Sequence, residues 1–321
     1  MTPHPPPLRV LYRHYGGENT KPRPAYYSKV LALVSMLRAA EQLDQAPELV
    51  YVNDQVRPGP LLTLMEATGE VVDIKGGSDA RSLRATFSRE AAREASPDQF
   101  LWFAEDDYLY RPDALRRLAQ GVEALPRASY VTVYGSGALD TAASRRRAVL
   151  ASEPGAGTAG AVATTGDVDW YPAAYATSTL GTRLSTLRQD LSLLRFTALS
   201  GGAWDQASWA ATAGYLPYTA AELRADLLPF RAVPPAGWPK ALARGSVRVA
   251  VSARALRRPS RRHPLFASDP ELVHHMEAPI PGARHELSAR SATTDWAAVA
   301  ADTWSWAAGS GLPVDPKGAT A

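Results

Sequence analysis

Three consecutive carboxylates, Glu105, Asp106 and Asp107, follow an apolar, aromatic-rich segment directly and precede a segment with helical spacing. Carboxylates so close together repel one another, so a positive charge is expected beside them. Divalent cations take oxygen ligands and commonly bridge phosphate oxygens. Such a cation neutralises the charge that develops on a nucleoside-diphosphate leaving group. A solvated acidic turn near the start of the next helix explains the same residues without chemistry, but their position at the end of a strand favours a site.

The elements that must position the triplet alternate between strand and helix. Strands are expected at residues 8–12, 48–53, 70–74, 99–103 and 129–134, and helices at 26–43, 61–67, 79–95 and 112–125. The helix at 112–125 is the clearest, because its leucines recur at helical spacing and Pro112 suits a first turn. Strands joined by helices predict an α/β fold with a mostly parallel sheet covered on both faces. In such sheets, ligands bind at the carboxyl ends of the strands.

The second half of the chain is less regular. A strand is expected at 168–171, and helices at 184–196, 204–213 and 296–307. Residues 151–166 are rich in Ala, Gly and Thr and predict a loop or mobile hairpin. Residues 216–264 are rich in Pro and Arg and poorly patterned, and they are interpreted as a possible mobile lid. One domain over residues 1–321 is therefore expected, with loops and helices added to one edge of the sheet.

Composition excludes several classes. The chain has 321 residues, a formal charge of +3 and no cysteine, so neither disulfides nor thiolate chemistry are available. The small charge gives no indication of nucleic-acid binding. The N-terminus lacks the pattern of a signal peptide, and no apolar run is long enough to span a membrane. The expected location is the cytoplasm.

The segment FLWFAEDDYLYRPDAL resembles the short acidic signature, followed by proline and a helix, of GT-A-fold glycosyltransferases close to family 2. The upstream order is similar too: a strand ends at Asn53-Asp54, and a Gly76-Gly77-Ser78 turn opens a helix. The first loop, with Tyr12-Arg13-His14-Tyr15, departs from the usual Pro and Asn, and the triplet opens with Glu instead of Asp. The resemblance covers the first 140 residues well and the rest thinly.

The resemblance implies roles for individual residues. It implies that residues 1–140 bind the nucleotide sugar and that residues 141–321 bind the acceptor. The implied nucleotide contacts are Asp54 to the base, the turn at Gly77, the region of Arg84, Glu105 facing the ribose, and the adjoining Asp106. The implied metal ligand is Asp107, with Mn²⁺ or Mg²⁺ as the cofactor. Arg13 in the first loop pairs either with the diphosphate or with a surface carboxylate.

Transfer to a hydroxyl or amine needs a base near the attacking atom. Asp205 follows the small residues 199–203 and lies in the first turn of an expected helix. In inverting members of the family a carboxylate after a Gly-rich stretch is the base, and Asp205 resembles it, so it should face Asp107 across the site. A helix-dipole role for Asp205 remains an alternative. Some GT-A enzymes complete the metal shell with a C-terminal histidine. Adjacent side chains point in different directions, so only one of His274 and His275 is expected to bind the metal, and His275 is favoured. A purely structural role for this histidine remains the alternative.

The expected function is transfer of a sugar, with inversion, from a nucleoside-diphosphate sugar to a hydroxyl or amine of a small molecule, glycan or peptide. Two rivals remain: a sugar nucleotidyltransferase, although residues 13–21 lack the usual Gly-rich, basic loop pattern, and a relative that binds the donor without catalysis. No G-x-G-x-x-G turn supports a dehydrogenase or methyltransferase. A run of arginines is interpreted as a lid, an anionic-acceptor site or a solvated face; it comprises Arg254, Arg257, Arg258, Arg261 and Arg262.

Overall fold

The computed structural model describes residues 7–18, 21–134, 161–173, 176–202, 204–231, 234–257, 263–277 and 288–314. Within them, nine strands form one sheet in the order β3-β2-β1-β4-β9-β6-β10-β8-β7. These strands are β1 (Arg9–Tyr15), β2 (Glu48–Asp54), β3 (Glu70–Ile74), β4 (Phe100–Glu105), β6 (Tyr130–Thr132), β7 (Ala163–Thr165), β8 (Val168–Ala173), β9 (Leu180–Arg183) and β10 (Leu265–Asp269). Strands β3, β2, β1 and β4 run parallel, and so do β6 and β10, whereas β9 is antiparallel to both of its neighbours.

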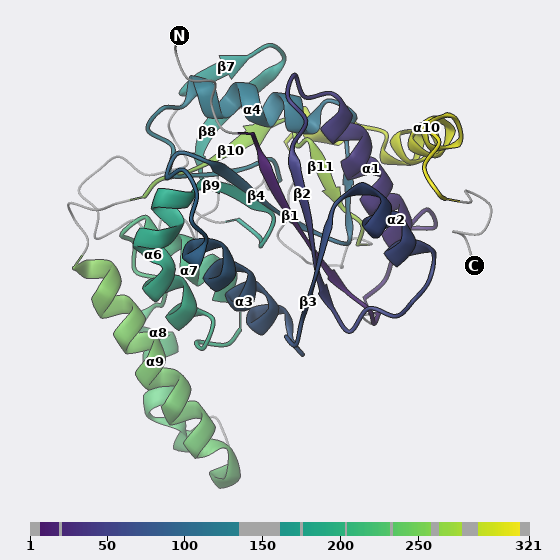
Figure 1. The fold of residues 1–321 in the computed structure, drawn as a ribbon. Helices are drawn as coiled ribbons and strands as arrows, with labels where there is room; N and C mark the ends of the chain where they lie inside the picture. The colour runs from purple at the N-terminus through teal and green to yellow at the C-terminus, as the bar shows by residue number, and fades with distance from the viewer. Residues whose placement is uncertain are drawn as a thin grey trace.

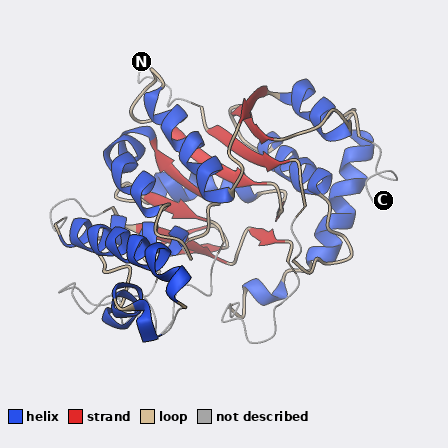
Figure 2. Ribbon diagram, turned by 90° about the horizontal axis from the view of Figure 1, so that it is seen from below, coloured by secondary structure: helices blue, strands red, loops and turns tan. Residues whose placement is uncertain are grey.

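Helices lie on both sides of the sheet, as Figures 1 and 2 show. They are α1 (Lys29–Glu41), α2 (Pro60–Thr68), α3 (Asp79–Ala92), α4 (Ala114–Ala124), α6 (Leu184–Thr197), α7 (Trp204–Thr212), α8 (Ala220–Leu227), α9 (Trp238–Leu256) and α10 (Trp296–Gly309), with short 3₁₀ turns η3 (Pro229–Arg231), η4 (Pro235–Gly237) and η5 (Ser291–Thr293). The predicted α/β class is therefore confirmed. None of the described helices has the length and apolar character that crossing a bilayer requires.

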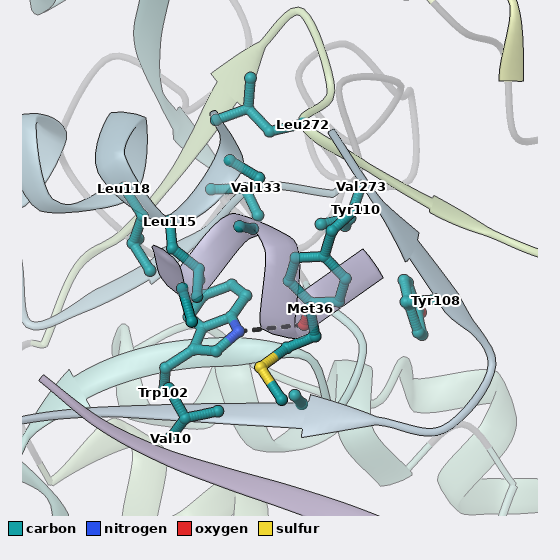
Figure 3. Packing of buried hydrophobic residues seen from close by; sticks show 14 of the residues in the cluster. Val10, Met36, Trp102, Tyr108, Tyr110, Leu115, Leu118, Val133, Leu272 and Val273 are labelled. Atoms are coloured by element: carbon teal, nitrogen blue, oxygen red, sulfur yellow. Dashed lines mark hydrogen bonds between the residues drawn. The ribbon is translucent and has the colours of Figure 1, made fainter. Parts of the chain in front are cut away.

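Side chains alternate across the central strands and build two hydrophobic layers. In β4, Trp102 packs with α1 and α4 on one face, while Leu101 and Phe103 pack with α3 and α6 on the other. The indole N–H of Trp102 donates to the hydroxyl of Tyr110 at 3.0 Å within this core, as Figure 3 shows. Because both faces are covered, β4 is rigid, and the acidic triplet that follows it is held by buried neighbours.

The segment 216–264 differs most from expectation. Its sequence pattern predicts no helix, but α8 and α9 occupy much of it. The buried residues of α9 are mostly small, including Ala241, Gly245 and Ala255, so no stripe of large apolar residues marks the helix. Of the loop or hairpin expected at 151–166, the described part agrees with the hairpin, because β7 pairs antiparallel with β8. Residues 151–160, and Arg258, Arg261 and Arg262, lie outside the described residues.

A buried ion cluster joins β1 to α3 at the amino ends of the strands, the opposite end of the sheet from the triplet. The fully buried Glu90 accepts hydrogen bonds from Arg9 at 2.8 Å, Arg89 at 2.7 Å and Arg93 at 3.1 Å. Removing one partner of a buried pair leaves an uncompensated charge. We expect Glu90→Gln to lower the free energy of unfolding by about 3 kcal/mol, measured by urea denaturation. Glu70→Gln is the matched control.

Glu70 contacts two of these arginines, Arg9 and Arg89, from a half-exposed position on the surface. Exposed ion pairs contribute about 1 kcal/mol or less, so its substitution should have a small effect. Equal effects of the two substitutions would contradict the importance of the buried cluster.

Candidate active site

The acidic triplet lies at the carboxyl end of β4, in a cavity of about 530 Å³. The short strand β5 (Tyr108–Tyr110) continues the chain and pairs with β11 (Val273–His275), which brings the C-terminal part of the chain to the triplet. The cavity collects nearly all the residues predicted from sequence. Those that line it are Arg13, Asp54, Gly77, Glu105, Asp106, Asp107, Asp205 and His275.

Glu105 is held by the strand beside it. Arg13 of β1 lies 2.8 Å from a Glu105 oxygen and 2.9 Å from Asp79 at the start of α3. Thr179 also donates to Glu105 at 3.3 Å. Burial raises the pKa of Glu105 to about 8, although Arg13 acts in the opposite direction. Arg13 therefore pairs with two carboxylates that line the cavity, the partly buried Glu105 and the exposed Asp79, and its contact with a diphosphate stays a prediction.

Asp106 ties the triplet to the loop that follows β1. Its carboxylate lies 2.6 Å from His14 Nδ1 and 3.0 Å from Lys29 Nζ, and it accepts the backbone N–H of Tyr15 at 3.1 Å. Burial opposes ionisation, but His14 and Lys29 hold the pKa of Asp106 below its ordinary value. Through these contacts, Asp106 positions the loop after β1 beside the cavity.

Asp107 forms a cluster with two residues of the C-terminal segment. His275 Nε2 lies 3.0 Å from Asp107 and 3.0 Å from Glu277, and one ligand atom of each residue lies within 4.8 Å of the others. Burial lowers the pKa of His275, but the two carboxylates outweigh it and raise this pKa to about 9. Arg23 also contacts Asp107 at 3.1 Å, and Lys21 contacts Glu277.

The two adjacent histidines point apart, as the alternation of strand side chains predicts. The His275 ring stacks on Tyr108, with ring centres 4.7 Å apart, and faces the cavity. His274 instead stacks on Trp296 of α10 at 5.2 Å. The choice of His275 over His274 as the residue near Asp107 therefore agrees with the geometry, while its role as a ligand stays a prediction.

The glycine turn before α3 is fixed by Asp54. Its two carboxylate oxygens accept the backbone N–H groups of Gly76 at 3.1 Å and Gly77 at 2.7 Å. Gly77 has a φ of +69°, in the left-handed region that favours glycine. Asp54 is buried, so its observed contacts are structural, and the base contact implied by the resemblance stays a prediction.

Arg84 is the one predicted site residue that does not line the cavity. It lies in a separate groove between α3 and α6, together with Arg81 and Arg195. Ser82 of the same helix does face the cavity. Arg84 comes two residues after Ser82 on α3, so its side chain leaves the helix about 200° away from that of Ser82. Arg84 therefore points away from the triplet.

Asp205 lies at the start of α7 and lines the cavity. Its carboxylate accepts the backbone N–H of Gln206 at 2.8 Å. Burial raises the pKa of Asp205 above its ordinary value, and no ion pair to it occurs within the described chain. A carboxylate with a raised pKa and no cationic partner is suited to accept a proton.

Sequence reasoning missed the cationic side of the cavity. Lys21, Arg23 and Lys29 from the first loop and α1 all line it, and Glu277 lies beside His275. The signal for the cations was present, because three basic residues follow β1 within a short span. Glu277 had no such signal, since only the pairing of β11 with β5 reveals its place.

No family model and no curated protein sequence matches the chain. Solved structures similar to it include Staphylococcus aureus TarS 1-349 (TM-score 0.40, 14% identity, covering 75% of this chain and 71% of that one). Mouse xyloside xylosyltransferase 1 has a TM-score of 0.39 at 12% identity, covering 64% and 80%. Mannosyltransferase PcManGT from Pyrobaculum calidifontis, in complex with GDP-Man and Mn²⁺, has 0.35 at 16%, covering 79% and 75%. TM-scores this low carry no inference about function, for which the cavity is the basis.

Proposed function

We propose that the chain is a divalent-metal-dependent glycosyltransferase that moves a sugar, with inversion, from a nucleoside-diphosphate sugar to a hydroxyl or amine. One observation carries the proposal. A single cavity combines the carboxylate and imidazole cluster at Asp107 with a partly buried carboxylate, Asp205, that forms no ion pair within the described chain. The first group suits a cation and the second suits proton transfer, and the proposed inverting transfer would use both.

The cluster of Asp107, His275 and Glu277 fits a divalent cation in its chemistry. It offers two carboxylates and one imidazole in close proximity. The two carboxylates suit Mg²⁺ and Mn²⁺ alike, and the imidazole departs from the oxygen-only ligation that is typical of Mg²⁺, so we test Mn²⁺. When bound, such a cation would stabilise negative charge on the departing diphosphate. His275 would then lose the proton that it shares with the two carboxylates.

The basic residues of the first loop would hold the phosphates. Lys21 and Arg23 neutralise Glu277 and Asp107 in the structure. With a cation on those carboxylates, the two side chains become available to phosphate oxygens, for which arginine has a matching donor geometry. On the acceptor side, Asp205 would take the proton as the new glycosidic bond forms and the bond to the diphosphate breaks. Direct displacement of this kind inverts the anomeric carbon.

A thermal-shift screen of UDP, GDP, TDP and CDP, with and without Mn²⁺, tests the donor site. A ligand at about 100 times its Kd stabilises the folded state by about 2.7 kcal/mol. For a chain of this length we expect a rise in Tm of about 4 °C for one nucleotide, and only with Mn²⁺. Glu277→Gln should abolish the Mn²⁺-dependent rise.

Glu123→Gln, on the exposed face of α4, is the matched control and should keep the full rise. If no nucleotide changes the Tm with or without Mn²⁺, the donor site is refuted. If a nucleotide stabilises the chain equally without the metal, the role of the cluster at Asp107 is refuted.

A sugar nucleotidyltransferase is the second candidate, favoured by the basic residues that the sequence pattern did not predict. Lys21, Arg23 and Lys29 reach the cavity from the loop region after β1, where such enzymes bind a nucleoside triphosphate. The two activities release different products. Release of pyrophosphate from a nucleoside triphosphate and a sugar phosphate would identify the nucleotidyltransferase, and release of nucleoside diphosphate from a nucleotide sugar would identify the glycosyltransferase.

A further inference from the structure

Exposed large hydrophobic side chains gather in one part of the molecule. Apart from Tyr15, Val162 and Leu199, every such side chain in the described residues belongs to the segment 227–256. They are Leu227, Leu228, Phe230, Trp238, Leu242, Val249 and Leu256. Scattered single apolar residues are normal on a protein surface, but a concentration of them marks an interaction site.

These residues lie on a helical hairpin that we call the arm, residues 219–257. It consists of α8, the turns η3 and η4, and α9, and Figure 1 shows it projecting from the rest of the fold. The connectivity places η3 and η4 at its tip. Phe230, 57% exposed, and Trp238, 37% exposed, flank this tip.

Polar contacts join the two helices of the arm, whereas Leu223, Val247 and Val251 pack against α6 and α7 at its base. Asp226 of α8 is buried and bonds to Arg244 at 2.9 Å and to Arg248 at 2.9 Å on α9. At Gly245 a Cβ atom would lie 3.0 Å from both Asp226 and Leu227, so the two helices approach closely there. The apolar side chains at the tip are therefore left on the outside and do not hold the hairpin together.

The charge of the arm is positive on its exposed surface. Helix α9 contains no Asp or Glu, and Lys240, Arg254 and Arg257 are exposed. The carboxylate of Asp226 is already neutralised within the hairpin. The exposed Glu222 is engaged by Thr219 in a capping box at the start of α8.

We propose that the arm docks on the surface of an anionic lipid bilayer, with the aromatic residues at its tip inserted at the headgroup level. Trp and Leu on the basic helix α9, with Phe in the adjoining turn η3, are the features of an interfacial element, and tryptophan is enriched at the membrane–water interface. Anionic headgroups complement Lys240 at the tip, and Arg254 and Arg257 at the other end of α9 extend the positive charge along the arm. A second copy of the chain would instead bring two positively charged surfaces together.

This inference goes beyond the proposed sugar transfer and does not depend on it. The two are linked in space, because Arg248 of α9 donates to the backbone of Ser200 at 3.2 Å, in the loop that leads to Asp205. An arm on a bilayer would therefore carry the Asp205 side of the cavity toward that surface. Acceptors presented by lipids would then be within reach.

Co-sedimentation of the full chain with vesicles tests the proposal. We expect binding to phosphatidylcholine vesicles that contain phosphatidylglycerol, and weaker binding to phosphatidylcholine alone. Raising the salt to about 1 M should reduce binding, because the Debye length shortens to about 3 Å. The double variant Phe230→Ser/Trp238→Ser should partition at least about tenfold less, since the contribution of two inserted side chains is lost.

Val162→Ser is the matched control, because Val162 is half-exposed but lies beside β7, away from the arm. It should bind vesicles as the wild type does, and thermal unfolding of both variants should be unchanged. Two results would overturn the proposal: a wild-type chain that ignores anionic vesicles, or a double variant that binds them equally well. A wild-type dimer in sedimentation velocity that becomes monomeric in the double variant would assign the tip to self-association instead. Nucleotide-dependent thermal shifts in the same preparations report on the donor site separately.

Discussion

Replacing Asp107 with asparagine is expected to lower kcat/KM for the proposed sugar transfer by about 10³-fold, because Asp107 would be a ligand of the cation that stabilises the departing diphosphate. Donor affinity should fall in the presence of Mn²⁺ and stay unchanged in its absence. Steady-state kinetics across a manganese titration, with calorimetric measurement of nucleotide binding, would show both effects. The substitution keeps the size of the side chain, so the contacts of Arg23 and His275 with position 107 are only weakened.

The matched control is Asp113→Asn. Asp113 lies in the same stretch of chain and pairs with Arg111 and Arg117, but it does not line the cavity. Its substitution should leave kinetics and nucleotide binding unchanged. Wild-type turnover in the Asp107 variant, at any manganese concentration, would remove Asp107 from the mechanism.

Asp205→Asn is expected to lower kcat by about 10³-fold while donor affinity stays within about twofold of wild type, since only proton removal from the acceptor is lost. The raised pKa of Asp205 should displace the acidic limb of the wild-type pH–rate profile upward, because the base must be ionised to act. The limb should disappear in the variant. Rapid-mix kinetics over a pH series, with equilibrium donor binding, would measure both.

The pKa of Asp205 also separates a catalytic loss from unfolding. Burial raises it above the unfolded value, so its contribution to stability is complete below the unfolded pKa and is lost as pH rises through the folded pKa. At neutral pH the ionised carboxylate therefore destabilises the fold, and asparagine removes that cost. The variant should be at least as stable as wild type at neutral pH. A collapse of donor binding together with a lower Tm would instead make Asp205 a structural residue.

Much of the N-terminal half could be predicted from sequence, because its buried strands and amphipathic helices carry large apolar residues at regular spacing. β3 occupies the residues expected for it, and α4 lies within its expected range. The arm could not be predicted, since small residues such as Gly245 form the buried side of α9 and larger ones such as Leu242 face solvent. The spacing rule assumes the opposite arrangement.

The candidate site divides along the same line. The triplet and the glycine turn could be predicted because each directly follows a strand in the sequence. The carboxyl ends of parallel strands lie at the same edge of the sheet, where ligands bind. Glu277 and the approach of His275 to Asp107 depend on pairing between strands more than 150 residues apart. Arg84 was assigned to the nucleotide because it follows the glycine turn closely in sequence. Its direction on α3 instead places it in a separate groove.

The interleaved strand order has a consequence for how the chain acquires its structure during synthesis. β9 lies between β4 and β6, and β10 lies between β6 and β8. A nascent chain that has not yet reached residue 265 therefore leaves a flank of β6 without its neighbour, and an open strand flank invites pairing with other molecules. Such a chain also lacks His275 and Glu277, so translation must run almost to the final helix before both the sheet and the cluster at Asp107 can be completed.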